Sequence, residues 1–446
     1  MRKKKNAFTL IELLAVIVIL AVILVISIPR ILDVIETSKK DSFKNAAQLI
    51  ADSAEKKKAS NKLLDKDEEI TCKDVAKIND EDYASCIISF DSEGNAKVSI
   101  TGKGKFDGLK ITNGTKENAE VKEITKPTYG MKAVEYITNL LEYNGDGLKK
   151  DNTSDENIRY YGSNPDNYVS FNNELWRIIG VFGNNVKLVR SEKLGNLSWD
   201  SSEESINGGY GVNEWSQSDL KNYLNTMYYD GTTVTCFGGW KNTTTTCPTN
   251  TIDETSKSLI DYHTWNTGAI DVTDTTIVND ETLALNTVPF YKAERGSVNG
   301  KICNGGDYCN DTVTRKTEWT GYIGLPYPTD YAYASSESDC ETNMNAGYNA
   351  TASSPDEAFV NMTCKKNNWM HHGTTMDIED ATWFISPLAN PGDANNVWGV
   401  YGVGLTGLGR AANPLSAFPT IYLKSNILIE SGKGTSSNPY MLKLNS

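Results

Sequence analysis

The stretch FTLIELLAVIVILAVILVISIP, residues 8–29, contains one charged side chain, that of Glu12, in an otherwise apolar run. The run from Phe8 to Ile28 is long enough to span a bilayer, because about 20 helical residues rising about 1.5 Å each cover about 30 Å. Arg2 and three lysines precede it, and the positive-inside rule places such a basic flank on the cytoplasmic side. A lone carboxylate inside a membrane span is costly, so Glu12 predicts a partner that neutralises it.

The apolar pattern continues beyond the membrane-length run. No small-residue cleavage site of the secretory type follows Ile28, which predicts that the run is retained. Apolar residues recur at helical spacing as far as Ala54, so we expect one long helix over residues 8–58, with residues 8–28 in the membrane. We expect Pro29 to kink this helix or to loosen its hydrogen bonding, because proline lacks the backbone donor.

These features together resemble the N-terminus of type IV prepilins and pseudopilins. The resemblance rests on the short basic leader, the sequence Phe8-Thr9-Leu10-Ile11-Glu12, the apolar helix and Pro29. It implies that a prepilin peptidase/N-methyltransferase removes residues 1–7 as a cytoplasmic leader, cutting between Ala7 and Phe8, and methylates the new amine. Ala7 departs from the glycine that members of the family usually carry before the cut.

The resemblance also supplies the partner that Glu12 requires. Cleavage would expose an ammonium group on Phe8, and a carboxylate four residues further along can neutralise it within one subunit or between neighbours. This pairing would set the axial register as subunits pass from the membrane into a filament. Phe8, Glu12 and Pro29 are therefore the expected assembly residues, and residues 8–28 would form the filament core.

Composition and cysteine spacing limit the possible partners and compartments. The 446 residues carry a formal net charge of -13, so we expect no nucleic acid as the main partner. Eight cysteines in close sequential pairs, in a chain with an export-type N-terminus, predict disulfides in an oxidising extracytoplasmic space. Sequence alone leaves the connectivity open, and the neighbour pairing we expect is Cys72 with Cys86, Cys236 with Cys247, Cys303 with Cys309, and Cys340 with Cys364.

The predicted fold class is α+β. Short strands expected at 87–90, 96–100 and 109–112 would form an antiparallel β-meander packed on the long helix, in a small domain over residues 59–126. Residues 127–157 are interpreted as a connector that contains a short amphipathic helix. Residues 158–446 would form a large, β-rich head stapled by the remaining disulfides.

The head carries features typical of recognition. The stretches 173–180, 324–332, 382–387 and 421–425 are similar to an uncharacterised domain fused to prepilin N-termini in monoderm bacteria, whose layout is similar to lectin-like or formylglycine-enzyme-like folds. All nine tryptophans lie in this part; sugar rings stack on exposed indoles, although tryptophans are often core residues instead. The expected ligand-binding residues are Trp319, Trp369, Trp383, Trp398, Asn390 and Asp393.

We expect no catalytic residues, no metal and no cofactor. The G-x-G-x-x-G match at 402–407 lacks the strand, helix and acid of a dinucleotide site, and no G-x-S-x-G elbow occurs. The adjacent His371 and His372 lack the spacing of a zinc motif. A calcium loop at 142–153 stays open, since acidic and amide oxygens are present but Thr153 replaces the closing acid.

These inferences predict a minor type IV pilin-like subunit with an adhesin-like head. It would first be a single-pass membrane protein with a cytoplasmic N-terminus and would then join an extracellular filament. Its expected partners are other pilin subunits, the processing enzyme, the cytoplasmic or inner membrane, and an unknown surface glycan or protein. The alternatives are a pseudopilin of a type II secretion-like or DNA-uptake apparatus, and an extracellular enzyme displayed on the membrane.

Overall fold

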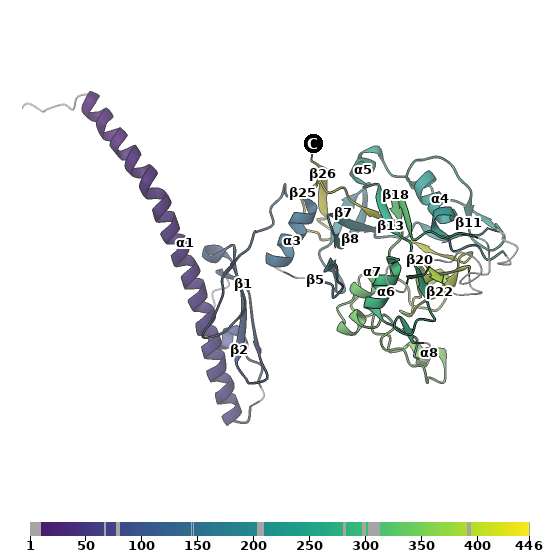
Figure 1. Ribbon diagram of the computed structural model, residues 1–446, viewed down its shortest axis with the longest axis horizontal. Helices are drawn as coiled ribbons and strands as arrows, with labels where there is room; N and C mark the ends of the chain where they lie inside the picture. Colours follow the sequence, from purple (N-terminus) through teal and green to yellow (C-terminus); the bar gives the residue numbers. More distant parts are fainter. Residues whose placement is uncertain are drawn as a thin grey trace, which may run out of the picture. The chain divides into compact units, whose positions relative to one another are not determined.

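The computed structural model describes residues 10–66, 68–76, 81–143, 145, 147–202, 209–279, 282–296, 300–301, 313–389 and 394–445. The chain divides into two compact units (Figure 1). The N-terminal unit comprises Met1–Lys126 with Glu142–Asn144, and the head comprises Pro127–Leu141 with Gly145–Ser446.

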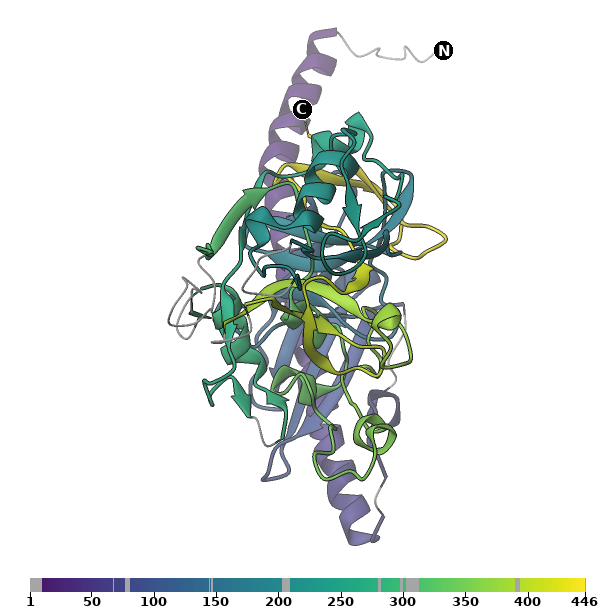
Figure 2. The same ribbon diagram turned by 90° about the vertical axis from the view of Figure 1, so that its right-hand side faces the viewer.

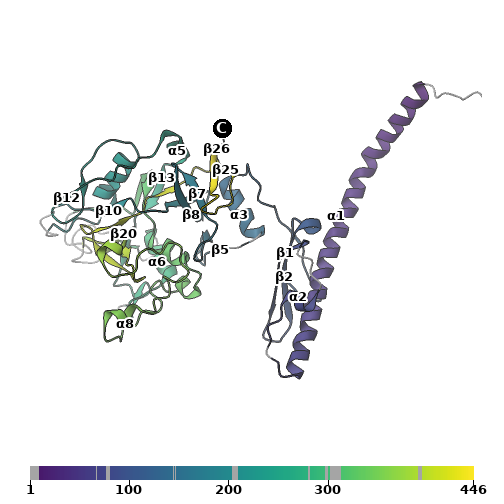
Figure 3. The same ribbon diagram turned by 180° about the vertical axis from the view of Figure 1, so that it is seen from behind.

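A single helix, α1 (Leu10–Leu63), forms the backbone of the N-terminal unit and continues without interruption through Pro29. Figures 1 and 3 show strands β1 and β2 beside its C-terminal half. Apolar side chains three or four residues apart meet the sheet there, because that spacing places them on one helix face. The buried members on α1 are Phe43, Ala47, Ile50, Ala51 and Ala54.

The sheet of the N-terminal unit is an antiparallel meander in the order β1-β2-β3-β4. The strands are β1 (Tyr83–Phe90), β2 (Ala96–Gly102), β3 (Leu109–Gly114) and β4 (Lys122–Glu123), with the short helices α2 (Cys72–Val75) and η1 (Gly104–Phe106). The three predicted strands are confirmed. The fourth has two exposed residues and therefore left no apolar pattern in the sequence.

Two larger sheets organise the described part of the head. A nine-stranded sheet has the order β19-β24-β9-β8-β7-β26-β25, with β6 on β8 and β5 on β6. Figure 2 shows its yellow C-terminal strands among strands from much earlier in the chain, and β26 pairs in parallel with β7. Its strands are β5 (Leu148–Lys150), β6 (Ile158–Tyr160), β7 (Tyr168–Phe171), β8 (Glu174–Phe182), β9 (Asn185–Arg190), β19 (Ile323–Gly324), β24 (Thr420–Tyr422), β25 (Ile427–Ser431) and β26 (Tyr440–Leu444).

A seven-stranded sheet has the order β10-β23-β20-β14-β17, extended from β20 by β21 and β22. Its strands are β10 (Gly195–Ser198), β14 (Ala269–Asp271), β17 (Gly300–Lys301), β20 (Thr382–Ala389), β21 (Asn396–Val400), β22 (Thr406–Arg410) and β23 (Pro414–Ala417). Three strand pairs lie apart from both sheets: β11 (Cys236–Phe237) with β12 (Thr244–Thr245), β13 (His263–Asn266) with β18 (Glu318–Gly321), and β15 (Val278–Asn279) with β16 (Ala284–Leu285).

Short helices connect these strands. The helices are α3 (Ala133–Tyr143), α4 (Asp219–Asn222), α5 (Glu254–Leu259), α6 (Thr287–Glu294), α7 (Pro328–Tyr333) and α8 (Pro355–Phe359), with single turns η2 (Trp215–Gln217), η3 (Tyr223–Tyr228), η4 (Ser338–Glu341) and η5 (Ile378–Asp380). Together with the long helix and the sheets, they confirm the α+β fold class.

Both faces of the nine-stranded sheet are covered, because its strands alternate between two apolar clusters. On β8, Trp176 and Ile178 belong to one cluster, whereas Ile179 belongs to the other. On β9, Leu188 belongs to the cluster of Trp176, and Val189 belongs to the cluster of Ile179. This period of two follows from strand geometry, in which successive side chains point to opposite faces.

The segment 127–157 is not a separate connector, and that expectation is corrected. Ala133, Tyr136 and Ile137 of α3 are buried in the same apolar cluster as Trp176 of the head. Residues 148–150 form strand β5, which pairs with β6. An amphipathic helix gains stability by burying its apolar face, and the head provides the surface that this helix covers.

Three of the expected disulfides join described residues: Cys72–Cys86, Cys236–Cys247 and Cys340–Cys364. The first links α2 to β1 in the N-terminal unit, and the other two lie in the head. Cys303 and Cys309 lie outside the described residues.

Candidate functional site

The N-terminal half of α1 exposes an apolar surface all round the helix. Its large apolar side chains between Ile11 and Ile35 are 47–77% exposed in the chain by itself. The mean hydropathy of an 18-residue segment of this helix is 2.9. Among the described residues, α1 is the one helix long and apolar enough to cross a membrane. A surface of this kind requires lipid or other apolar helices around it.

The predicted assembly residues lie before this surface, at its start and near its end. Glu12 and Pro29 are part of α1, whereas Ala7 and Phe8 lie outside the described residues. Because α1 is continuous, the exposed half and the half packed on the sheet form one rigid element.

In the head, the structure corrects the prediction for two of the four tryptophans. Trp383 on β20 is fully buried and donates from Nε1 to the carbonyl of Leu197 at 2.9 Å. Trp398 on β21 is 3% exposed and packs edge-on against Phe290. Both strands are covered on both sides, so these indoles stabilise the core and offer no free face to a sugar.

Trp319 and Trp369 have different environments. Trp319 on β18 is half-buried with its ring edge-on to Trp215. Trp369 is 5% exposed and lines a pocket of about 520 Å³. Asn390 and Asp393 lie outside the described residues.

The pocket beside Trp369, which we call the Arg177 pocket, lies on the face of the nine-stranded sheet that carries Ile179 and Val189. Its lining includes residues of strands β7, β8 and β9 and residues of β20, β21 and the turn before β24. Aromatic and aliphatic side chains make up most of its wall: Leu175, Val189, Tyr331, Phe384, Val400 and Phe418.

Arg177 is the cation within this pocket, and it is only 7% exposed. Its guanidinium carbon lies over the rings of Tyr168 and Trp369, at 4.2 and 4.6 Å from their centroids. Nε donates to Asn167 Oδ1 at 2.8 Å, and Nη2 donates to Asn164 Oδ1 at 3.2 Å. Aromatic faces stabilise a cation, and the amide acceptors fix its orientation.

No carboxylate pairs with Arg177 among the residues that the structure describes. Burial lowers the pKa of Arg177 to about 10, so the group still carries its positive charge at neutral pH. The neighbouring Arg190, by contrast, is neutralised by Glu174, whose Oε2 lies 2.6 Å from Nε. Among the described residues, the pocket therefore contains one buried cation without a counter-ion.

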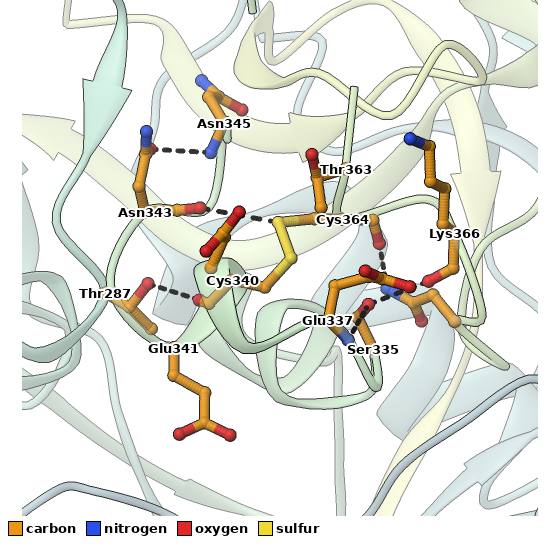
Figure 4. The surroundings of a disulfide bond; sticks show 12 residues. Thr287, Ser335, Glu337, Cys340, Glu341, Asn343, Asn345, Thr363, Cys364 and Lys366 are labelled. Carbon is orange, nitrogen blue, oxygen red and sulfur yellow. Dashed lines mark hydrogen bonds between the residues drawn. A yellow bond between two sulfur atoms is a disulfide. The ribbon is translucent and has the colours of Figure 1, made fainter. Parts of the chain in front are cut away.

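The loop that carries Trp369 is held in place by the Cys340–Cys364 disulfide and its surroundings (Figure 4). Ser335 donates to the carbonyl of Lys366 at 2.8 Å, and Thr287 donates to the carbonyl of Cys340 at 2.7 Å. Further along, Trp369 donates from Nε1 to Tyr160 O at 2.8 Å and from its backbone to Gly162 O at 2.9 Å. This wall of the pocket is thus preformed.

The sequence-based selection missed Arg177, and a signal for it was present. Arg177 sits between Trp176 and Ile178 in a strand that is apolar on both sides, where an arginine requires special partners. The selection also missed Trp240, which is the most exposed of the nine tryptophans at 48% and contacts Tyr210 edge-on.

Each of the three histidines contacts an aromatic or acidic side chain. His371 Nδ1 lies 3.0 Å from the hydroxyl of Tyr331, His372 stacks on Phe418, and His263 Nδ1 lies 3.0 Å from Asp261 Oδ2. Within the described ranges, no three metal-binding side chains converge. Of the possible calcium loop, Asn144 and Asp146 lie outside those ranges, and the Thr153 hydroxyl donates to Asp151 at 2.6 Å.

Comparison with known families matches the prokaryotic N-terminal methylation motif to residues 2–28. No curated protein and no solved structure matches the chain. The matched residues include the basic leader, Glu12 and most of the exposed half of α1. The chain therefore has a type IV prepilin-like N-terminus, and the large C-terminal domain is a separate body.

Proposed function

We propose that this pilin-like or pseudopilin subunit is a minor component of an extracellular type IV filament and that its head is a binding module. The methylation motif implies processing by a prepilin peptidase and assembly with other pilins. The observation that carries the filament assignment is the apolar surface of α1, which runs from the motif to Ile35 on one uninterrupted helix. Packing against the same surface of other subunits would bury it outside the membrane.

The size of the head supports a minor position. The head accounts for more than two thirds of the chain, since it includes residues 145–446. A domain of this size is difficult to accommodate on every subunit of a close-packed helical array. Low abundance or a place at the tip avoids this crowding.

Binding is the activity that we propose for the head, in preference to catalysis. The Arg177 pocket has an apolar wall and one cation without a counter-ion, which are the features of a recognition site. The described histidines contact Phe418, Asp261 and the Tyr331 hydroxyl, and burial raises the pKa of that hydroxyl, which disfavours its use as a nucleophile.

Replacement of Glu12 by alanine tests the assembly half of this proposal. Glu12→Ala removes the carboxylate that would pair with the amine of mature Phe8, so we expect recovery in sheared surface filaments to fall at least about tenfold while the membrane pool persists. Immunoblots of both fractions give the ratio.

Asp41→Ala is the matched control, because Asp41 is an exposed acid on the same helix beyond the apolar surface that ends at Ile35. It should leave the ratio close to that of the wild type. Glu12→Ala that assembles at the wild-type level would contradict the proposed pairing.

A further inference from the structure

We propose that the Arg177 pocket binds the C-terminal carboxylate of a peptide whose last side chain is apolar. The inference rests on the proposed function of the head as a binding module and names the ligand class for it. A guanidinium group without a counter-ion and an adjoining apolar wall together match a carboxylate attached to an apolar body.

The charge of the pocket requires an anion. Arg177 is 7% exposed, and a buried cation is costly unless an opposite charge accompanies it. Its Nε and Nη2 atoms donate to Asn167, Asn164 and Pro165, whereas Nη1 has no acceptor among the described residues. Nη1 can therefore donate to one or both oxygens of a ligand carboxylate.

The orientation of the guanidinium group is fixed before any ligand arrives. The rings of Tyr168 and Trp369 both contact it, and Asn167, itself fully buried, donates to the carbonyl of Ile178 at 2.8 Å. A preorganised donor loses little conformational entropy on binding. These contacts indicate a site built for recognition, because they hold the charge in place without neutralising it.

The wall of the pocket favours an apolar body over a sugar. Phe384 and Val400 are at most 2% exposed and belong to the apolar cluster on this face of the sheet, and Phe418 is 5% exposed. Several hydroxyl groups of a sugar placed against such a wall would lose hydrogen bonds to water without replacement. An aliphatic or aromatic side chain gains from the same contact.

The size and rim of the pocket fit one or two residues of a peptide end. Its volume of about 520 Å³ lies within the range of small-ligand sites. The exposed carboxylate of Glu192 lies at the pocket, and the Glu174–Arg190 pair adds no net charge. Attraction for an anion therefore comes from the buried charge of Arg177, because solvent screens the exposed Glu192 more strongly.

The decisive measurement compares a free acid with an amide on the unmodified protein. Acetylated Gly-Gly-Leu, as the free acid and as the C-terminal amide, is titrated calorimetrically into the full chain in detergent. We expect the acid to bind at least about tenfold more tightly than the amide, because only the acid can form a charge-assisted pair with Arg177.

Replacement of Arg177 tests whether the preference for the acid depends on its positive charge. Arg177→Gln should remove the preference for the acid, with both peptides then binding equally weakly. Arg410→Gln is the matched control, because Arg410 is exposed and stacks on Tyr210 at 4.1 Å outside the pocket. It should retain the tenfold preference, and a far-ultraviolet circular dichroism spectrum identical to that of the wild type verifies folding of both variants.

Three results would overturn the inference. They are equal affinity for acid and amide, absence of binding of either peptide at millimolar concentration, and binding of N-acetylneuraminate or glucuronate in place of the peptide acid. Equal affinity for acid and amide, or binding of a sugar acid, would still leave the head a binding module, and recovery in sheared filaments tests the filament assignment independently. Failure of this inference is therefore distinguishable from failure of the proposed function.

Discussion

Lys187 lies fully buried in the head with its ammonium group against the carboxylate of Asp330. Arg159 reaches the other oxygen of Asp330 and also Asp151, at 2.9 Å from Oδ2. Burial lowers the pKa of Lys187 to about 8, against the opposing effect of Asp330. Burial would raise the pKa of Asp330, but Lys187 and Arg159 together hold it below its usual range. The network joins β6, β9 and α7 through charges that depend on one another.

Removal of one member of this network should be costly. Lys187→Met leaves the buried Asp330 with one of its two cations, and we expect a loss of about 3 kcal/mol in the free energy of unfolding. Urea unfolding followed by tryptophan emission measures this loss in the head, since all nine tryptophans lie there.

Lys443→Met is the matched control, because Lys443 pairs with Glu430 at 3.1 Å but is 61% exposed. An exposed pair of this kind contributes less than about 1 kcal/mol. Equal losses in the two variants would show that the buried network does not stabilise the head in the way described.

Helices and strands with a regular hydrophobic pattern could be predicted from the sequence. The surfaces that cover those elements in the folded head could not. The periodicity of α1 gave its type and its approximate end, since the helix ends at Leu63 and residue 58 was expected. The turn at Asp91, whose Oδ1 accepts from the backbone of Asn95 at 2.9 Å, marked the β1–β2 hairpin. The amphipathic pattern of α3 was visible, but the surface that it covers is formed by strands distant in sequence.

The candidate site was less predictable, because segments distant in sequence form it. Trp369 could be selected by residue type, whereas Trp383 and Trp398 share that type and lie in the core. Arg177 becomes distinctive only when β8, Tyr168 and the loop after Cys364 are brought together. Sequence spacing does not encode these contacts between distant segments.

The Cys340–Cys364 disulfide should contribute strongly to the stability of this region. It closes a sequence separation of 24 residues, for which restriction of the unfolded chain gives about 3 kcal/mol. Cys340→Ala combined with Cys364→Ala should therefore lower the urea midpoint of the tryptophan transition, and alanine avoids burying a hydroxyl group. An unchanged midpoint would contradict this role.

At the scale of the whole molecule, one helix serves two environments. Its N-terminal half exposes apolar side chains on every side, and its C-terminal half packs on the small sheet through Phe43 and the alanines that follow at helical spacing. The sequence predicted this division, because the change from an all-apolar run to a one-sided stripe is visible in it. The methylation motif at residues 2–28 connects the apolar half to processing and assembly.

Processing at Phe8 and assembly into filaments are tested together by the intact mass and N-terminal sequence of the chain from sheared surface filaments and, separately, from membranes. We expect a chain that begins at methylated Phe8 in the sheared fraction, with its mass lowered by the hydrogens lost in each disulfide. A chain that still begins at Met1 and occurs only in membranes would contradict it, because Glu12 would then never meet the amine that cleavage creates.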